Sequence, residues 1–109
     1  FIGQRYNLPM YITENGLSCN DKVYLDGKVH DAGRIDFTAR YLQSLARGID
    51  RGADVRGYFH WSLIDNFEWY SGYNERFGLY FMDYATGARI PKDSAAWYAH
   101  VVKTNGVYL

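Results

Sequence analysis

Two short β-rich segments, separated by one long helical segment, constrain the fold of this chain more than any other feature. Leu8 to Thr13 is a short apolar run that stops at the turn signal Asn15-Gly16. Val55 to Trp61 is rich in β-branched and aromatic residues, which favours a second strand. Strand, helix and strand in succession indicate a parallel pair, because parallel strands need a crossover connection that is usually a helix.

The helical segments follow from capping and stop signals. Asp31 is suited to an N-cap, and a stripe at helical spacing continues from it until Gly52 ends the segment. The stripe consists of Ile35, Thr38, Leu42, Leu45 and Ile49. A second amphipathic helix is predicted from Asp93 to the stop signal Asn105-Gly106. Phe1 to Asn7 is expected to be the tail of an earlier helix.

Two long connections hold most of the unusual residues. Leu17 to His30 is a polar loop with a turn predicted at Asp26-Gly27. Ser62 to Lys92 is longer still and contains a predicted hairpin around Thr86-Gly87. Loops of this length are uncommon in compact domains and are usually functional.

Two consecutive strand-helix units cannot close a parallel sheet. Such strands need both faces covered and a neighbour on each side, and a complete (β/α)₈ barrel takes about 250 residues. The expected fold class is therefore α/β, as two to three eighths of a barrel. Residues 1–109 contain no linker and are expected to form one part of a single domain that ends near the natural C-terminus. Alone, the chain would expose apolar strand edges and self-associate or unfold.

Charge and cysteine content exclude several classes of partner. Twelve basic and twelve acidic side chains leave no net charge, so nothing steers the chain to nucleic acid or an anionic membrane. No apolar stretch is long enough to span a bilayer. The single cysteine, Cys19, cannot form an intramolecular disulfide, and the compartment stays open with the cytoplasm favoured. We expect no cofactor and no metal.

Candidate chemistry gathers at the end of each predicted strand. Glu14 follows the first strand, where catalytic groups of parallel barrels lie, although an acid there is also typical of a solvated loop. His60 to Tyr70 alternates acceptors and an amide with flat aromatic rings. The acceptors and amide are Asp65, Asn66 and Glu68. Sugars need both kinds of contact, since aromatic faces cover their C–H patches and carboxylates accept their hydroxyl hydrogen bonds. The competing interpretation is an aromatic core with acids that serve as caps.

Three motifs in the same order resemble the C-terminal part of glycoside hydrolase family 1. They are Ile-Thr-Glu-Asn-Gly at 12–16, His-Trp-Ser-Leu-Ile-Asp-Asn-Phe-Glu-Trp at 60–69, and Arg-Phe-Gly-Leu at 76–79, which precedes Asp83-Tyr84. The resemblance covers nearly the whole chain. It implies a (β/α)₈ TIM barrel that hydrolyses β-glucosides with retention of configuration. This chain would supply strands seven and eight with their helices.

The resemblance also implies roles for individual residues. Glu14 matches the catalytic nucleophile, and Trp61 matches the aromatic platform beneath the sugar. Glu68 matches the carboxylate that binds the hydroxyls at positions 4 and 6, and Trp69 matches the neighbouring indole. Phe77 matches an aromatic residue that lines the same pocket. An acid at Glu68 favours unphosphorylated β-glucosides, with β-galactosides and β-fucosides as secondary substrates, because a carboxylate repels a phosphate.

One essential group is missing from these residues. Retaining hydrolysis needs a second carboxylate about 5 Å from the nucleophile, and the family carries it in a Thr-Xaa-Asn-Glu-Pro motif that this chain lacks. Neither Asp65 nor Glu75 is a credible replacement. Three interpretations remain open: part of a β-glucosidase completed by a second polypeptide with the N-terminal part of the barrel, an inactive isolated fragment, or a carbohydrate-binding module without hydrolysis.

Overall fold

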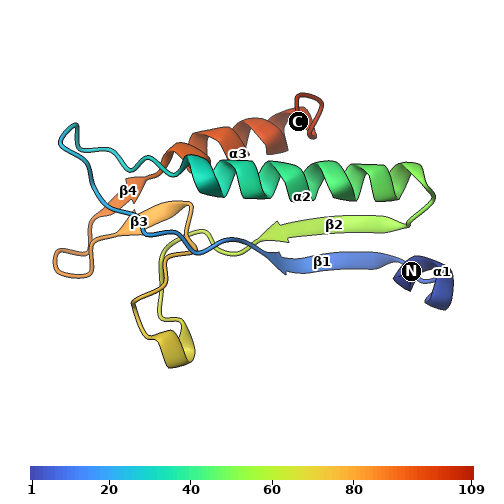
Figure 1. Ribbon diagram of the computed structural model, residues 1–109, viewed down its shortest axis with the longest axis horizontal. Helices are drawn as coiled ribbons and strands as arrows, with labels where there is room; N and C mark the ends of the chain where they lie inside the picture. Colours follow the sequence, from blue (N-terminus) through green and yellow to red (C-terminus); the bar gives the residue numbers. More distant parts are fainter.

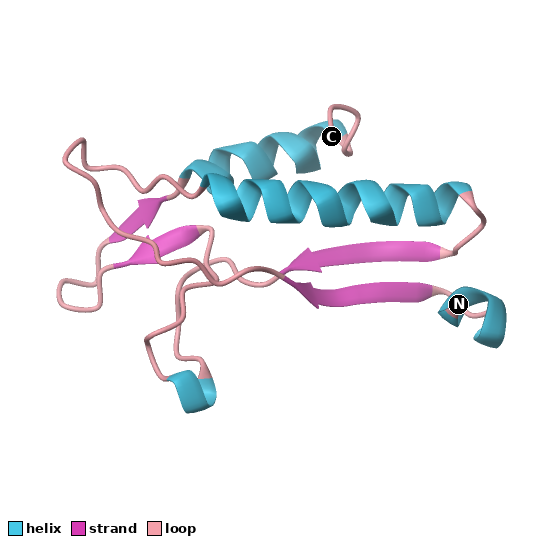
Figure 2. Cartoon of the chain, viewed as in Figure 1, coloured by secondary structure: helices cyan, strands magenta, loops and turns pink.

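The computed structural model describes every residue from Phe1 to Leu109. Its elements in chain order are α1 (Ile2–Tyr6), β1 (Met10–Asn15), α2 (Ala32–Asp50), β2 (Val55–His60), the 3₁₀ helix η1 (Trp69–Ser71), β3 (Tyr80–Met82), β4 (Arg89–Pro91) and α3 (Asp93–Thr104). Figures 1 and 2 show α2 and α3 side by side over one face of the two long strands. The strand-helix order expected from the sequence is confirmed.

The two long strands are adjacent and parallel, as predicted. Met10 pairs with Val55 and Asn15 pairs with His60, so both strands end at the same edge of the sheet. β1 is longer at this edge than predicted, because it includes Glu14 and Asn15 instead of stopping at Thr13. The reason is local: the Asn15 carbonyl accepts the Trp61 N–H at 2.9 Å, which extends the pairing past the apolar run.

Helix α2 begins where the sequence predicts, but Asp31 does not act as a side-chain cap. It occupies the N-cap position without a capping hydrogen bond. Its carboxylate instead pairs with Arg34 and accepts hydrogen bonds from the Ser94 backbone and hydroxyl. The stripe is buried at Thr38 and Leu42 but exposed at Ile49. A sheet of two strands is too narrow to cover the whole helix.

The predicted hairpin and final helix are both present. β3 and β4 pair antiparallel, and Gly87 lies between them with a positive φ of 76° that the turn requires. Helix α3 ends at Thr104 and is followed by Asn105, which adopts the left-handed conformation common just after a helix. The turn near Asp26 is also confirmed, with Gly27 at a φ of 77°.

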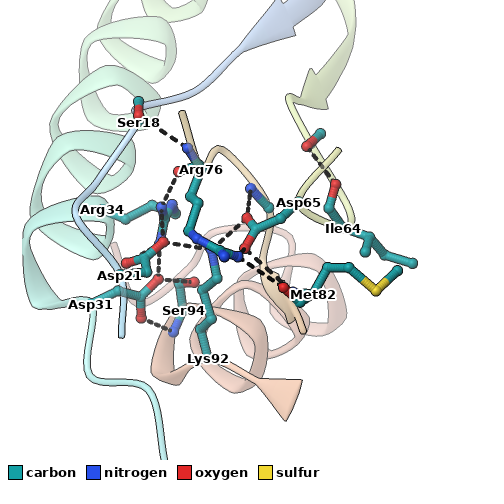
Figure 3. A network of polar contacts seen from close by, with 12 residues as sticks. Ser18, Asp21, Asp31, Arg34, Ile64, Asp65, Arg76, Met82, Lys92 and Ser94 are labelled. Carbon is teal, nitrogen blue, oxygen red and sulfur yellow. Dashed lines mark hydrogen bonds and ion pairs between the residues drawn. The ribbon is translucent and has the colours of Figure 1, made fainter. Parts of the chain in front are cut away.

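A cluster of paired charges takes the place of an apolar core where the loops meet the helices (Figure 3). Lys92 donates to both Asp21 and Asp65, and Asp65 also pairs with Arg76 at 2.7 Å. Arg34 pairs with Asp21 and Asp31. The six side chains, three carboxylates and three cations, are Asp21, Asp31, Asp65, Arg34, Arg76 and Lys92. Removing one partner from a buried pair costs about 3–5 kcal/mol, since the other charge is then left unpaired.

The apolar surface of the sheet is incompletely covered. Only 12 of the 109 residues are buried, so the chain does not enclose a core of its own. Tyr11 of β1 and Phe59 of β2 are more than half exposed, and a groove of about 320 Å³ runs between α2 and α3. Further chain must cover this surface if the sheet is to be buried on both faces.

Two histidines, His60 and His30, lie in environments that shift their pKa values in opposite directions. His60 in β2 has both ring nitrogens buried without a hydrogen-bond partner. Burial and the nearby Arg34 charge lower the pKa of His60 to about 4, although the Phe77 backbone, which comes close, acts the other way. His30 is exposed and donates to Asp93 at 2.6 Å and to Asp26 at 2.9 Å. These two hydrogen bonds raise the pKa of His30 above 6.5.

We predict that His60 stays neutral in the folded chain until the pH approaches 4, while His30 carries a proton above its usual range. The measurement is an NMR titration of the histidine ring protons. The two residues should titrate on opposite sides of pH 6.5. A His60 midpoint at or above 6.5 would contradict its placement in the structure.

The same shifts set the pH dependence of folding. The unfolded chain binds a proton at His60 more readily than the folded chain, so this residue lowers the free energy of unfolding as the pH falls from 6.5 towards 4. His30 adds stability below 6.5 and loses that contribution as the pH rises through its raised pKa. His60→Leu should therefore flatten the acid side of the stability profile, and His30→Leu should not.

Candidate functional site

The candidate nucleophile lies at the carboxyl end of β1. Glu14 is exposed, and the next residue, Asn15, is fixed by two contacts from β2 and its continuation. Tyr58 donates its hydroxyl to the Asn15 side chain at 2.8 Å, and the Trp61 N–H donates to the Asn15 carbonyl. Burial raises the pKa of Tyr58, so its hydroxyl remains a donor at neutral pH. The backbone beneath Glu14 is thus held while its carboxylate faces open space.

Trp61 and Glu68 form a pair beside this strand end. The Trp61 indole Nε1–H donates to a Glu68 carboxylate oxygen at 3.1 Å. The loop after β1 lies directly against Trp61, since a Cβ at Gly16 would be 1.7 Å from the Trp61 carbonyl oxygen. Only glycine allows this approach. The strand end that carries Glu14 and the Trp61–Glu68 pair are therefore in contact through their backbones.

Phe77 lies on the returning arm of the same loop. Its carbonyl accepts the Ser62 N–H at 3.1 Å, which places Phe77 next to the residue that follows Trp61. Gly78 then packs against the outgoing arm, because a Cβ there would be 2.2 Å from the Asp65 nitrogen. The two arms of the loop are consequently in tight backbone contact.

Trp69 lies at the tip of the loop, in η1. Its side chain is 83% exposed, and its backbone has a positive φ of 46°, which is unusual for a bulky residue. The indole packs edge to face on Phe67, with ring centroids 6.2 Å apart. No side-chain hydrogen bond or ring pairing joins Trp69 to the Trp61–Glu68 pair. Figure 1 shows η1 at a distance from the sheet of β1 and β2 and from the helices α2 and α3.

The structure separates the acids and amide that the sequence grouped as possible sugar ligands. Glu68 is accessible, but Asp65 is buried and bonded to Arg76, Lys92 and the Gly78 N–H. Asp65 is thus wrong as a sugar acceptor, because each of its oxygens is already occupied by protein donors. Asn66 is also occupied, since its amide donates to Ser62 and Ile64 within the loop.

The aromatic residues of this loop form no core within residues 1–109. Trp61, Phe67, Trp69, Tyr70 and Tyr73 are all exposed. Conversely, sequence reasoning missed Arg34 and Lys92, which are buried in the charge cluster. The sequence did contain a signal for Arg34. It precedes Thr38 by four residues, so it lies on the same buried face of α2, where a charged residue is unexpected.

The candidate site is an open surface in this chain. Glu14, Trp61, Glu68, Trp69 and Phe77 line none of the four pockets in the structure. No group of three histidine, cysteine or acidic side chains is arranged to hold a metal ion. None of the helices has the length and apolar character needed to cross a membrane. The residues present offer an exposed carboxylate, a second carboxylate paired with an indole, and further aromatic faces.

Comparison with known proteins agrees with this arrangement. The family model described as glycosyl hydrolase family 1 matches residues 1–107. Beta-glucosidase A of Thermotoga maritima is 49% identical over 107 residues, which cover 97% of this chain. A bifunctional beta-D-glucosidase/beta-D-fucosidase of Bifidobacterium breve is 50% identical over 99 residues, or 87% of this chain.

Solved structures match equally well. A family 1 β-glucosidase from Thermotoga maritima superposes with a TM-score of 0.95 at 48% identity, over 97% of this chain. The chain spans only 24% of Beta-glucosidase A, 22% of the Bifidobacterium breve enzyme and 25% of that solved structure. Its fold is that of about a quarter of a family 1 β-glucosidase. With 107 of its 109 residues matched by the family, the chain belongs to glycosyl hydrolase family 1.

Proposed function

We propose that this chain supplies the nucleophile and part of the glycone subsite of a retaining β-glucosidase. The observation that carries the proposal is the position of Glu14, exposed at the carboxyl end of β1 and beside the Trp61–Glu68 pair. Matched structures of the Thermotoga maritima enzyme in complex with glucoimidazole and with deoxynojirimycin support a sugar-shaped ligand. Terminal β-D-glucosyl residues are the preferred substrate, with related β-glycosyl residues next.

The proposed reaction is a double displacement. The ionised Glu14 carboxylate attacks the anomeric carbon, the bond to the leaving group breaks, and a covalent glycosyl-enzyme forms. Water then attacks the same carbon and releases Glu14 as a carboxylate. Trp61 offers its face to the sugar ring, and Glu68 accepts hydrogen bonds from the sugar hydroxyls. Trp69 and Phe77 are proposed to close the same end of the subsite.

A second polypeptide segment is needed for this chemistry. We infer that residues 1–109 form the C-terminal part of one TIM-barrel domain, with β1 and β2 as strands seven and eight. The exposed side chains of Tyr11 and Phe59 support this, since they leave apolar surface on the sheet that the rest of a barrel would cover. The missing part would carry the acid/base glutamate about 5 Å from Glu14. Alone, the chain is expected to be an inactive fragment.

Sugar binding without hydrolysis is the second candidate. It is favoured by the exposed aromatic rings of Phe67 and Trp69, which are typical of carbohydrate-binding surfaces. This candidate predicts that the isolated chain binds glucose weakly and that salt does not weaken the binding. Loss of that binding in Trp61→Ala would support it.

The experiments use a graft in which this chain replaces the matching segment of Beta-glucosidase A from Thermotoga maritima, to which it is 49% identical. In the graft, Glu14→Gln should lower kcat for an aryl β-glucoside by at least about 10⁴-fold, because an amide cannot form the glycosyl-enzyme. The measurement is steady-state hydrolysis. Turnover retained within about tenfold of the unmodified graft would rule out Glu14 as the nucleophile.

Glu68→Ala in the same graft should lower kcat/KM by about 10² to 10³-fold, because two hydrogen bonds from sugar hydroxyls to a carboxylate are lost. Asp36→Ala is the matched control, since Asp36 is an exposed carboxylate on α2 that pairs with Arg40. A Glu68→Ala variant as active as the control would count against a role in binding the glycone.

A further inference from the structure

We propose that Arg34 is a positioning residue that braces the loop that follows the nucleophile against the loop that binds the glycone. The inference rests on the proposed function but concerns a residue outside the glycone contacts. Arg34 lies in the first turn of α2, and its side chain is 0% exposed. It touches neither Glu14 nor any group proposed to contact the sugar.

The Arg34 guanidinium bridges the two loops through one carbonyl of each. Arg34 Nε donates to the Leu17 carbonyl at 3.2 Å, three residues after Glu14. Arg34 Nη2 donates to the Arg76 carbonyl at 2.6 Å, one residue before Phe77. These two carbonyls belong to segments that share no strand ladder. The planar guanidinium therefore braces these two carbonyls at one fixed spacing, together with the direct hydrogen bond from the Cys19 N–H to the Arg76 carbonyl at 3.1 Å.

The guanidinium is itself held by two carboxylates. Asp31 pairs with Nη1, and Asp21 receives Nη2 at 2.6 Å. Asp21 also receives Lys92, which in turn donates to Asp65 at 2.8 Å. Figure 3 shows these side chains converging from the loop after β1, from α2, from the loop after β2 and from the junction between β4 and α3. The Arg34 side chain is thus held directly by Asp21 and Asp31, and Asp21 is in turn held by Lys92.

The second loop is rigid where Arg34 meets it. Asp65 accepts the Gly78 N–H at 2.9 Å and the Arg76 guanidinium at 2.7 Å, which joins the outgoing and returning arms. Glu68 follows Asp65 by three residues. A shift of the Arg76 carbonyl is consequently transmitted to both arms, and so to Glu68.

Lysine cannot replace this geometry. It keeps the positive charge that Asp21 and Asp31 need, but one ammonium group on a flexible stem cannot serve two separated carbonyls and two carboxylates at fixed spacing. Arg34→Lys therefore removes the bridge between the Leu17 and Arg76 carbonyls and retains the positive charge. Arg40→Lys is the matched control, because Arg40 lies on the same helix with a side chain that is 76% exposed and pairs only with Asp36.

The test is a double-mutant cycle in the graft, with kcat and KM measured for an aryl β-glucoside. Arg34→Lys should lower kcat/KM by about 10- to 100-fold, mainly through kcat, because the sugar is held out of line with the nucleophile. In a Glu68→Ala background the same substitution should cost less than about threefold, because the misplaced contact is already gone. Arg40→Lys should match the unmodified graft in both backgrounds.

Two outcomes would overturn the proposal. One is an Arg34→Lys variant that melts at a lower temperature but keeps the kcat/KM of Arg40→Lys, which would indicate stabilisation alone. The other is an equal loss with and without Glu68, which would mean that Arg34 does not act through the glycone loop. An unmodified graft without activity would instead contradict the proposed function.

Ser18→Ala keeps the test decisive if Arg34→Lys does not fold. The Ser18 hydroxyl donates to Glu75 and accepts the Arg76 N–H at 3.2 Å, so it joins the same two loops without a buried charge. Its loss should lower kcat/KM by about threefold, and most of this effect should disappear in the Glu68→Ala background. An unchanged kcat/KM in Ser18→Ala would then reject the premise of the proposal, which is that contact between these two loops affects catalysis.

Discussion

The buried pairing of three carboxylates with three cations is the interaction on which the arrangement of the site depends. The parallel ladder of β1 and β2 ends near Asn15 and His60, and the loops beyond it lack a regular ladder between them. Arg34, Asp65 and Lys92 brace these loops against each other, in addition to the hydrogen bonds that Arg76 makes with Ser18 and Cys19. Such pairs are costly to bury but strict in geometry, because each unpaired member would leave an isolated charge. Specific loop placement, more than net stability, is what this cluster contributes.

Periodicity and turn chemistry predicted the elements of the chain well. The stripe from Ile35, the hairpin at Gly87 and the stop at Asn105 all follow from local physics, and all are present. The charge cluster was not predictable in the same way, because its partners are far apart in sequence: Lys92 is 71 residues from Asp21. Asp31 illustrates this limit of local reasoning: it occupies the predicted N-cap position, but its side chain makes no capping hydrogen bond.

The sequence indicated which residue types belong to the candidate site, but it did not indicate which contacts their side chains make. The motifs around Glu14 and Trp61 pointed to candidate residues, and the family match covers the segments that contain them. No periodicity could separate Asp65 from Glu68, although one is buried among cations and the other pairs with an indole. The incomplete cover of Tyr11 and Phe59 is consistent with a chain that spans 24% of Beta-glucosidase A. A closed subsite requires the strands that this chain lacks.

The most direct test of the central claim is covalent trapping in the completed barrel. An activated 2-deoxy-2-fluoro-β-glucoside slows both chemical steps, while its good leaving group lets the first outrun the second, so the glycosyl-enzyme accumulates. Mass spectrometry of the digested protein should then find one sugar on the peptide that contains Glu14. A sugar on any other carboxylate, or time-dependent inactivation without labelling of this chain, would contradict the account.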